Sequence, residues 1–344
     1  MLREAGHPST RLLERDRLPG RDGGGASLPA VVLVGGEGTR LRPLTERTPK
    51  PMLPLLGRPL LSYTFDHLRS AGADRAVLAC GYLPTQIEDY FGNRYDGLAL
   101  EYRVEPETLG TGGAIRFGAE GFRETFLALN GDCLREADIT TLVDFHRAMG
   151  AKATILLAQV SDPGRYGLVR RDDVGRVTAF VEKPEAAEID TNLINAGLYV
   201  LEPEVLDLIT PGAPVSIERE VFPALVAEGS LYALALPGYW LDVGTPQSYL
   251  QAHFDLLNRK GGVEIAPTAE IAPDTSLVPP IYIGSGVQVQ RDARIGPCVA
   301  LGADSQVGQR GTVRFSTVLE AAKIAARARI THGIVAPEIG VITP

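Results

Sequence analysis

The chain has 344 residues, of which 44 % are hydrophobic and 22 % charged, so it has the composition of a globular protein and the length of two domains. Its formal net charge of −8 at pH 7 argues against binding to nucleic acid or to an anionic membrane. No apolar run approaches the ~20 residues of a membrane span. The 3 cysteines lack the spacing of a disulfide framework or a zinc site, which predicts a cytoplasmic location.

The chain begins with a segment that has no pattern typical of a folded element. Residues 1–29 contain a run of three glycines and no apolar segment of the kind found in signal peptides, so we expect a disordered N-terminal extension. Residues 30–34, with the sequence AVVLV, are wholly apolar and mostly β-branched. Such a run is typical of a strand buried on both faces of a parallel sheet.

A glycine-rich loop follows this first strand. Gly35, Gly36 and Gly38 let the backbone bend sharply, so that its N–H groups can approach an anion. Thr39 and Arg40 add a hydroxyl group and positive charge at the same place. The loop matches neither the dinucleotide fingerprint nor the P-loop, because it lacks the glycine and the lysine that these motifs require. We interpret it as a binding loop for a polyphosphate.

Helices and strands alternate from residue 59 to residue 160. The expected helices are 59–70, 85–91, 107–115 and 139–149, and the expected strands are 75–80, 99–104, 126–129 and 154–160. Alternation at this spacing predicts βαβ units around a mainly parallel sheet, in which ligands bind at the carboxyl ends of the strands. The glycine loop and Asp132 both fall at such ends.

The region from about residue 163 to residue 245 differs. Strands are expected at 166–170, 177–181, 198–201 and 238–242, and helices at 203–209 and 216–227. We interpret this region as a second lobe built on mixed sheet. Thr245 as N-cap and Pro246 at the first helical position then begin a helix that is expected to end near Asn258.

The C-terminal part of the chain has a different period. Apolar residues recur at every sixth position, namely Ile265, Ile271, Leu277, Ile283, Val289, Ile295, Leu301, Val307, Val313 and Leu319. This is the hexapeptide pattern of a left-handed parallel β-helix. The series fails at Ala325 and Thr331, so we expect residues 261–344 to form a β-helix that ends in an irregular C-terminal tail.

The glycine loop belongs to a longer motif. The chain reads GGEGTRLRPLT at residues 35–45 and PKPMLP at residues 49–54. This motif resembles the signature of the sugar-1-phosphate nucleotidylyltransferases (NDP-sugar pyrophosphorylases), and most closely that of the mannose-1-phosphate guanylyltransferase branch. The resemblance implies an α/β fold with a Rossmann-like nucleotidyltransferase domain at 30–260, whose second lobe lies on the sugar side, followed by the β-helix.

The resemblance also implies a reaction. An NTP, with GTP favoured, would react with a sugar 1-phosphate, with mannose 1-phosphate favoured, to give an NDP-sugar and pyrophosphate. The phosphate of the sugar would attack the α-phosphorus in line, so catalysis would depend on positioning and charge neutralisation. The implied catalytic residues are Arg40, Lys50, Asp132, Lys183 and Asp242.

The implied binding residues divide into three groups. The nucleotide-binding group is Leu33, Gly35, Gly36, Gly38, Thr39 and Gly110, and the sugar-binding group is Gly167, Glu182 and Asn195. Asp132 and Asp242 would hold one Mg²⁺, which takes one or two carboxylates together with phosphate oxygens. Each of these two aspartates follows an apolar strand segment.

Several alternatives remain open at this point. The base could come from dTTP or UTP, and the sugar could be glucose, a heptose or a carbocyclic sugar analogue. A non-catalytic regulatory subunit is a second class, although such paralogues typically lose the loop arginine or a metal aspartate. A hexapeptide acyltransferase needs a histidine in the coils, and residues 265–319 contain none. We also expect a homo-oligomer assembled through the β-helix.

Overall fold

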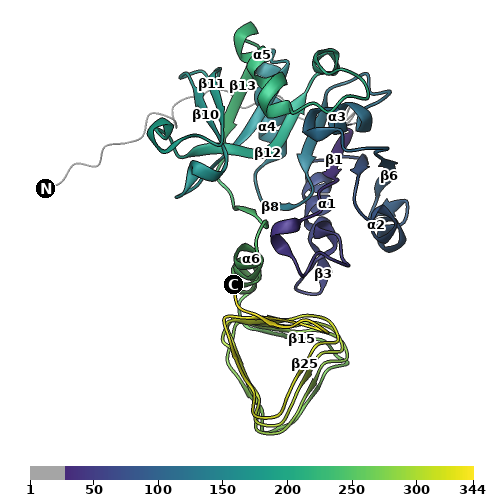
Figure 1. Ribbon diagram of the computed structural model, residues 1–344, viewed down its shortest axis with the longest axis vertical. Coiled ribbons are helices and arrows are strands. Elements are labelled where there is room, and N and C mark those ends of the chain that lie inside the picture. The colour runs from purple at the N-terminus through teal and green to yellow at the C-terminus, as the bar shows by residue number, and fades with distance from the viewer. Residues whose placement is uncertain (1–27) are drawn as a thin grey trace, which may run out of the picture.

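The computed structural model describes residues 28–344 (Figure 1). Leu28 is buried, and the carbonyl oxygen of Pro29 accepts a hydrogen bond of 2.9 Å from the N–H of Leu127. These two residues therefore belong to the folded domain rather than to the extension that was predicted over 1–29. The predicted disorder of residues 1–27 lies outside the described residues. Within residues 28–344, no helix is both long and apolar enough to cross a membrane.

The first domain is organised around one mixed sheet in the order β11-β10-β12-β7-β1-β4-β6-β5, with β9 beside β12 and β13 beside β9. β1 is parallel to β4 and β7, β4 is parallel to β6, and β12 is antiparallel to β7 and β9. The strands are β1 Ala30–Val34, β4 Arg75–Cys80, β5 Arg94–Tyr95, β6 Leu98–Val104, β7 Phe126–Asn130, β9 Ala153–Gln159, β10 Gly167–Arg171, β11 Val177–Glu182, β12 Leu193–Leu201 and β13 Leu231–Ala235. The predicted mainly parallel sheet is confirmed for β7, β1, β4 and β6, which end at one edge.

Helices cover both faces of this sheet. They are α1 Leu60–Ser70, α2 Pro84–Phe91, α3 Gly110–Gly118, α4 Ile139–Met149, α5 Phe222–Glu228 and α6 Pro246–Lys260. Successive side chains of β1 point to opposite faces of the sheet. Val32 packs in the core on one face, together with Phe65 of α1 and Leu142 of α4. Val31 packs in the core on the other face, together with Ile115 of α3 and Leu225 of α5. A strand buried on both faces in this way explains the wholly apolar sequence of residues 30–34.

Two predicted helices differ from the structure, and one strand was not predicted. The segment expected as a helix at 203–209 is a 3₁₀-helix over Pro203–Leu208. The helix expected from residue 216 begins as a π-helix over Ile217–Val221 and becomes α-helical only at Phe222, because Pro223 has no N–H to extend the ladder backwards. Strand β13 was not predicted, and it extends the sheet by pairing in parallel with β9.

A small two-stranded ladder joins the two halves of the domain. β8, Cys133–Arg135, pairs antiparallel with β14, Trp240–Asp242. Asp242 stands opposite Cys133 in this ladder. Two aspartates that are far apart in the sequence, Asp132 and Asp242, are thereby held at one place.

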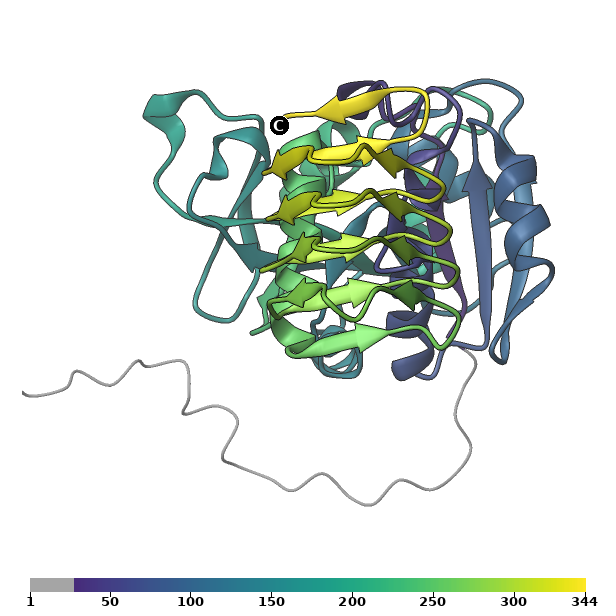
Figure 2. The same cartoon turned by 90° about the horizontal axis from the view of Figure 1, so that it is seen from below.

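The C-terminal domain is a parallel β-helix. Figure 1 looks along its axis and shows coils with a triangular outline, and Figure 2 shows the coils stacked on one another. The strands form three parallel stacks, β15-β18-β21-β24-β27, β16-β19-β22-β25 and β17-β20-β23-β26, with β28 antiparallel to β27 at the end. They are Val263–Ile265, Glu270–Ile271, Ser276–Leu277, Ile281–Ile283, Gln288–Val289, Arg294–Ile295, Val299–Leu301, Gln306–Val307, Thr312–Arg314, Ser316–Val318, Lys323–Ile324, Arg329–Thr331, Ile334–Ala336 and Gly340–Ile342 for β15 to β28 in chain order.

The register of the β-helix corrects the prediction at its C-terminal end. Ile283 pairs with Leu301, but Leu301 pairs with Val318, so this coil is one residue shorter than the one before. Val318, rather than Leu319, is the fully buried residue. The series continues one position early at Ile324 and Ile330, which is why Ala325 and Thr331 broke the sixfold pattern. The residues expected as an irregular tail therefore form further coils up to β27, and β28 folds back on them.

An apolar interface joins the β-helix to the first domain. Tyr249 and Leu250 of α6 belong to one buried cluster with Leu41, which follows the glycine loop, and with Ile334 of β27. His253 of α6 is buried, and its Nε2 lies 3.4 Å from Oγ1 of Thr317 in β24. The last coils of the β-helix thus support the helix that follows Asp242.

Candidate active site

The glycine loop at the end of β1 turns back on itself. Gly38 has a φ of 62°, and a Cβ atom there would lie 3.1 Å from Cγ2 of Thr45 and 3.2 Å from Cβ of Lys50. The hydroxyl group of Thr45 donates a hydrogen bond of 2.8 Å to the carbonyl oxygen of Gly38. Glycine is required at this position because the backbone is left-handed and the space is already filled. The turn brings Lys50 beneath the loop.

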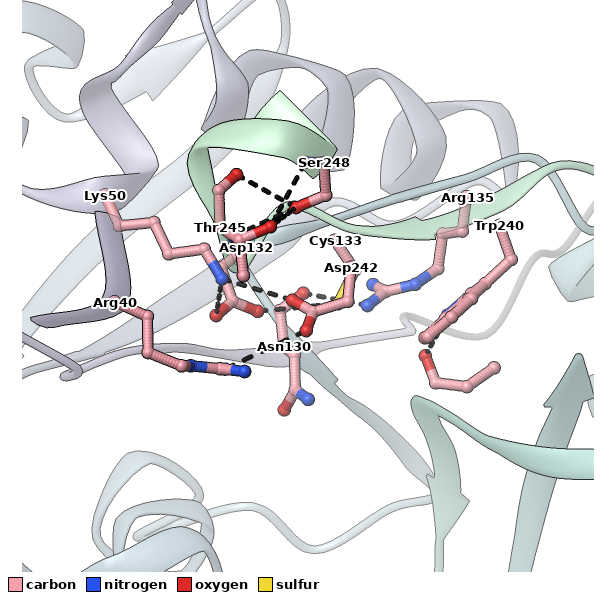
Figure 3. A network of polar contacts seen from close by, with 11 residues as sticks. Arg40, Lys50, Asn130, Asp132, Cys133, Arg135, Trp240, Asp242, Thr245 and Ser248 are labelled. Atoms are coloured by element: carbon pink, nitrogen blue, oxygen red, sulfur yellow. Dashed lines mark hydrogen bonds and ion pairs between the residues drawn. The ribbon is translucent and has the colours of Figure 1, made fainter. Parts of the chain in front are cut away.

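Lys50 lies between two carboxylates (Figure 3). Its Nζ is 2.7 Å from Oδ2 of Asp132 and 3.2 Å from Oδ1 of Asp242. Only 7 % of the Lys50 side chain is exposed, against 36 % for Asp132 and 20 % for Asp242. The structure therefore places three of the five predicted catalytic residues in contact, with the ammonium group buried and the carboxylates partly open to solvent.

The electrostatics of this group are coupled. Burial by itself lowers the pKa of Lys50, but the charges of Asp132 and Asp242 outweigh burial and raise it above its ordinary value. Burial likewise raises the pKa of Asp132, and the charge and hydrogen bond of Lys50 outweigh it, so that the pKa falls below its ordinary value. Lys50 and Asp132 are thus both held in their charged forms.

Arg40 reaches toward the same group from the exposed side. Its Nη2 lies 4.0 Å from Oδ2 of Asp242, and 69 % of its side chain is exposed. A Cβ atom on Gly244 would lie 2.8 Å from Oδ2 of Asp242 and 3.1 Å from Nη2 of Arg40. Glycine at this position therefore leaves space for Arg40 to approach Asp242. Arg40 makes no short ion pair in the part of the chain that the structure describes and can turn toward an anion.

A cavity of about 220 Å³ lies over these residues. It is lined by Leu33, Val34, Gly36, Gly38, Thr39, Arg40, Lys50, Pro51, Asp132 and Gly244. Of the six residues predicted to bind nucleotide, four line the cavity, namely Leu33, Gly36, Gly38 and Thr39, and Gly35 is their neighbour in the chain. Gly110 is separate. A Cβ atom there would lie 2.7 Å from the carbonyl oxygen of Val215, so this glycine is needed where α3 packs against the second lobe.

The predicted sugar-binding residues lie in the second lobe and differ in their surroundings. A Cβ atom on Gly167 would lie 2.6 Å from Cζ of Phe180 and 3.0 Å from Oε2 of Glu182, so the glycine leaves room chiefly for the Phe180 ring and also for this carboxylate. Burial raises the pKa of Glu182. Asn195 uses its side chain internally, because Nδ2 donates to Oη of Tyr199 at 2.9 Å and Oδ1 accepts from the N–H of Gly197 at 2.9 Å. Lys183 is exposed, has a φ of 51° and is not part of the Lys50 group.

The sequence prediction did not single out two carboxylates that contact the N-terminal end of α3. Glu218 accepts hydrogen bonds from Oγ1 of Thr111 at 2.6 Å and from Oγ of Ser216 at 2.8 Å, which ties α3 to the second lobe. Glu105 follows β6 and accepts a hydrogen bond of 3.0 Å from the N–H of Leu109. The only signal for Glu105 in the sequence was its place directly after a strand at the binding edge.

Comparison with known proteins identifies the class. The model of the nucleotidyl transferase family matches residues 29–259, so the chain belongs to this family. Among curated relatives, it is 43 % identical over 280 residues to the mannose-1-phosphate guanylyltransferase of Mycobacterium tuberculosis, covering 78 % of this chain and 76 % of the relative. It is 38 % identical over 331 residues to the mannose-1-phosphate guanyltransferase of Candida albicans, covering 89 % and 90 %. These relatives confirm the predicted resemblance.

Solved structures agree with the fold. HddC from Yersinia pseudotuberculosis, in complex with GMP-PN, is 29 % identical with a TM-score of 0.57, and the match covers 65 % of this chain and 97 % of that one. A UDP-glucose pyrophosphorylase in complex with UDP-glucose has a TM-score of 0.62 at 20 % identity, covers 68 % and 100 %, and supports the fold alone.

Proposed function

We propose that this chain transfers the guanylyl group of GTP to mannose 1-phosphate, giving GDP-mannose and pyrophosphate. The observation that carries the proposal is the contact of Lys50 with Asp132 and Asp242 beneath the glycine loop. The relatives named as mannose-1-phosphate guanylyltransferases favour guanine as the base and mannose as the sugar. Lys50, Asp132 and Asp242 are all present in this chain, which favours an enzyme over a non-catalytic regulatory subunit.

The reaction can proceed without a general base. The phosphate oxygen of mannose 1-phosphate attacks the α-phosphorus of GTP, a new P–O bond forms, and the bond to the pyrophosphate oxygen breaks. Negative charge on the phosphoryl oxygens must be neutralised while the two phosphates are held in line. Arg40 is free to bind the triphosphate and the leaving pyrophosphate, and Lys50 supplies a fixed positive charge below the loop.

The carboxylates suit a magnesium ion. One ligand atom from each of Asp132, Cys133 and Asp242 lies within 4.8 Å of the others. Burial raises the pKa of the Cys133 thiol, whose Sγ donates to Oδ1 of Asp132 at 3.5 Å, and a soft sulfur ligand does not suit Mg²⁺, which prefers oxygen. The remaining oxygen donors fit Mg²⁺, which Asp132 and Asp242 would hold. When bound, Mg²⁺ supplies charge neutralisation to phosphate oxygens.

The second lobe would hold the sugar. Glu182, whose Oε2 lies beside Gly167, would accept hydrogen bonds from sugar hydroxyl groups. Lys183, the next residue in the chain, is exposed and would bind the sugar phosphate. The side chain of Asn195 is already hydrogen-bonded to Tyr199 and Gly197, so it would support the sugar site through these contacts rather than bind the sugar directly.

We further propose a cytoplasmic homo-oligomer. All three cysteines, Cys80, Cys133 and Cys298, are free thiols, which suits a reducing compartment. The β-helix is the expected assembly surface, and sedimentation of the full chain and of a variant truncated before residue 261 would show whether association depends on it.

The function is tested by pyrophosphate release with each of the four NTPs, combined with mannose, glucose and heptose 1-phosphates and a carbocyclic analogue, in the presence of Mg²⁺. We expect a single sharp maximum at GTP with mannose 1-phosphate. A maximum at GTP with another sugar would replace the proposed acceptor. Folded protein that releases no pyrophosphate with any pair would contradict the proposal.

A further inference from the structure

We propose that Arg135 is a positioning residue that balances the charge of Asp132 and Asp242 from the side opposite Lys50. By this balance it allows a site built on two carboxylates to bind polyanionic substrates. The inference rests on the proposed function, because it assumes that the two carboxylates lie where Mg²⁺ and the phosphates of GTP bind. The sequence motifs of the site did not single out Arg135.

Burial sets Arg135 apart from the other cations of the chain. Within residues 28–344, Lys50 and Arg135 are the only lysine and arginine that are buried, each with 6 % of its surface exposed. Buried charges are rare in proteins unless a partner compensates them. Both residues belong to segments that meet at Asp132, since Lys50 contacts its carboxylate and Arg135 follows it by three positions in the chain.

The turn between β7 and β8 fixes the direction of the Arg135 side chain. Arg135 is the last residue of β8, the strand that pairs with β14 and therefore lies beside Asp242. Its Nη2 donates a hydrogen bond of 3.0 Å to the carbonyl oxygen of Asn130, two residues before Asp132. The side chain thus runs back along the turn that carries Asp132. In Figure 3, Lys50 and Arg135 point toward the two carboxylates from opposite sides.

Arg135 has no countercharge of its own. Its guanidinium group makes no ion pair with a carboxylate of residues 28–344, and Nε and Nη1 have no hydrogen-bond acceptor there. Its charge acts on Asp132 at longer range. Burial raises the pKa of Asp132, the charge and hydrogen bond of Lys50 lower it, and Arg135 is a smaller cause in the same direction. Since unpartnered buried donors and charges destabilise a fold, the benefit of this arginine lies in the site it faces.

Charge balance explains an arginine in this position. Asp132 and Asp242 bring two negative charges to a site that receives a nucleoside triphosphate and a phosphate monoester. Lys50 offsets one of these charges and Arg135 offsets the second, so the buried group is neutral before a ligand binds. An uncompensated carboxylate would attract a cation more strongly and repel phosphate groups. Loss of Arg135 should therefore change the affinities for cations and for phosphates in opposite directions.

The test is calorimetric binding of Mg²⁺ to the nucleotide-free chain and of GTP in EDTA, together with thermal unfolding, for the unmodified chain, Arg135→Met and Arg135→Lys. We expect Arg135→Met to bind Mg²⁺ about fivefold more tightly and GTP about fivefold more weakly. Its midpoint of thermal unfolding should rise by about 2–4 °C, because an unpartnered buried charge is lost. Arg135→Lys keeps the charge and should keep both affinities within about twofold of the unmodified chain.

The matched control is Arg103→Met, the same substitution at an arginine that has partners. Arg103 pairs with Glu101 at 2.7 Å and donates a hydrogen bond of 3.0 Å to the carbonyl oxygen of Phe117. We expect this variant to have a lower midpoint of thermal unfolding and unchanged affinities for Mg²⁺ and GTP.

The outcomes separate the inference from the proposed function. An unmodified chain that releases no pyrophosphate with any NTP overturns the proposed function. In an active chain, unchanged affinities of Arg135→Met overturn only the role of Arg135, and so do affinities that weaken together, as a damaged fold would give. If Arg135→Met does not fold, Arg135→Gln, which keeps a donor for Asn130 without the charge, should show the same opposite shifts. Failure of both variants to fold would overturn the inference.

Discussion

The contact of Lys50 with two carboxylates leads to a prediction about stability that does not depend on turnover. Replacing Lys50 by Met keeps the aliphatic stem but removes the charge that lies 2.7 Å from Asp132 and 3.2 Å from Asp242. Breaking a fully buried ion pair costs about 3–5 kcal/mol. Because 36 % of the Asp132 side chain is exposed and water screens it, we expect a smaller loss of about 2–3 kcal/mol in the free energy of unfolding.

The assay is urea unfolding of the unmodified chain and Lys50→Met, each in EDTA and in millimolar MgCl₂. A divalent cation between Asp132 and Asp242 would replace the lost ammonium charge, so Mg²⁺ should stabilise the variant by about 1–2 kcal/mol more than the unmodified chain. The control is Lys152→Met, which breaks the exposed ion pair with Glu228 and should leave the free energy of unfolding nearly unchanged, because water screens both charges. Equal stability of Lys50→Met and the unmodified chain in EDTA would refute the reasoning.

Three further effects follow from single positions. Burial lowers the pKa of His253 to about 3, so the unfolded chain takes up a proton below about pH 6.5 while the folded chain stays neutral. The free energy of unfolding therefore contains the full contribution of neutral His253 above about pH 6.5, and loses up to about 1.4 kcal/mol per pH unit below it. Between about pH 7 and pH 5, urea unfolding should show a smaller loss of stability for His253→Gln than for the unmodified chain. Gly197→Ala should lower the unfolding free energy by about 2 kcal/mol or more, because φ is 65° and the new Cβ would lie 2.5 Å from Nδ2 of Asn130. The matched control is Gly150→Ala, which also has a positive φ but has open space around the new Cβ, and it should cost only about 1 kcal/mol. Thr245→Ala removes the N-cap of α6 and should lower the unfolding free energy by about 1 kcal/mol, measured by the same assay.

Most of the architecture could be predicted because the sequence signals were local. The apolar run at 30–34, the alternation of helices and strands and the sixfold series each report a repeated backbone geometry. The capping of α6 was equally local: Thr245 accepts a hydrogen bond from the N–H of Ser248, as its position before Pro246 predicted. Each of these features depends on residues close together in the chain.

The errors came from features that only the folded chain defines. One missing residue between Leu301 and Val318 shifted the register of the β-helix, and a fixed period could not follow it. The pairing of β14 with β8, which holds Asp242 near Asp132, is antiparallel and joins distant segments. Neither the internal hydrogen bonds of Asn195 nor the approach of Glu105 to Gly35 follows from spacing, because each depends on packing between separate strands.

The most direct test of the account is guanylyl transfer by Asp242→Asn, with Asp144→Asn as a surface control. Asn is nearly isosteric but uncharged, so the variant should keep its secondary structure while kcat for pyrophosphate release from GTP and mannose 1-phosphate falls by about a thousandfold. Asp144 is exposed, and its one ion pair within residues 28–344 is a 4.0 Å contact with Arg147, so its variant should retain full activity. A folded Asp242→Asn variant that releases pyrophosphate at nearly the unmodified rate would contradict the assignment of this site.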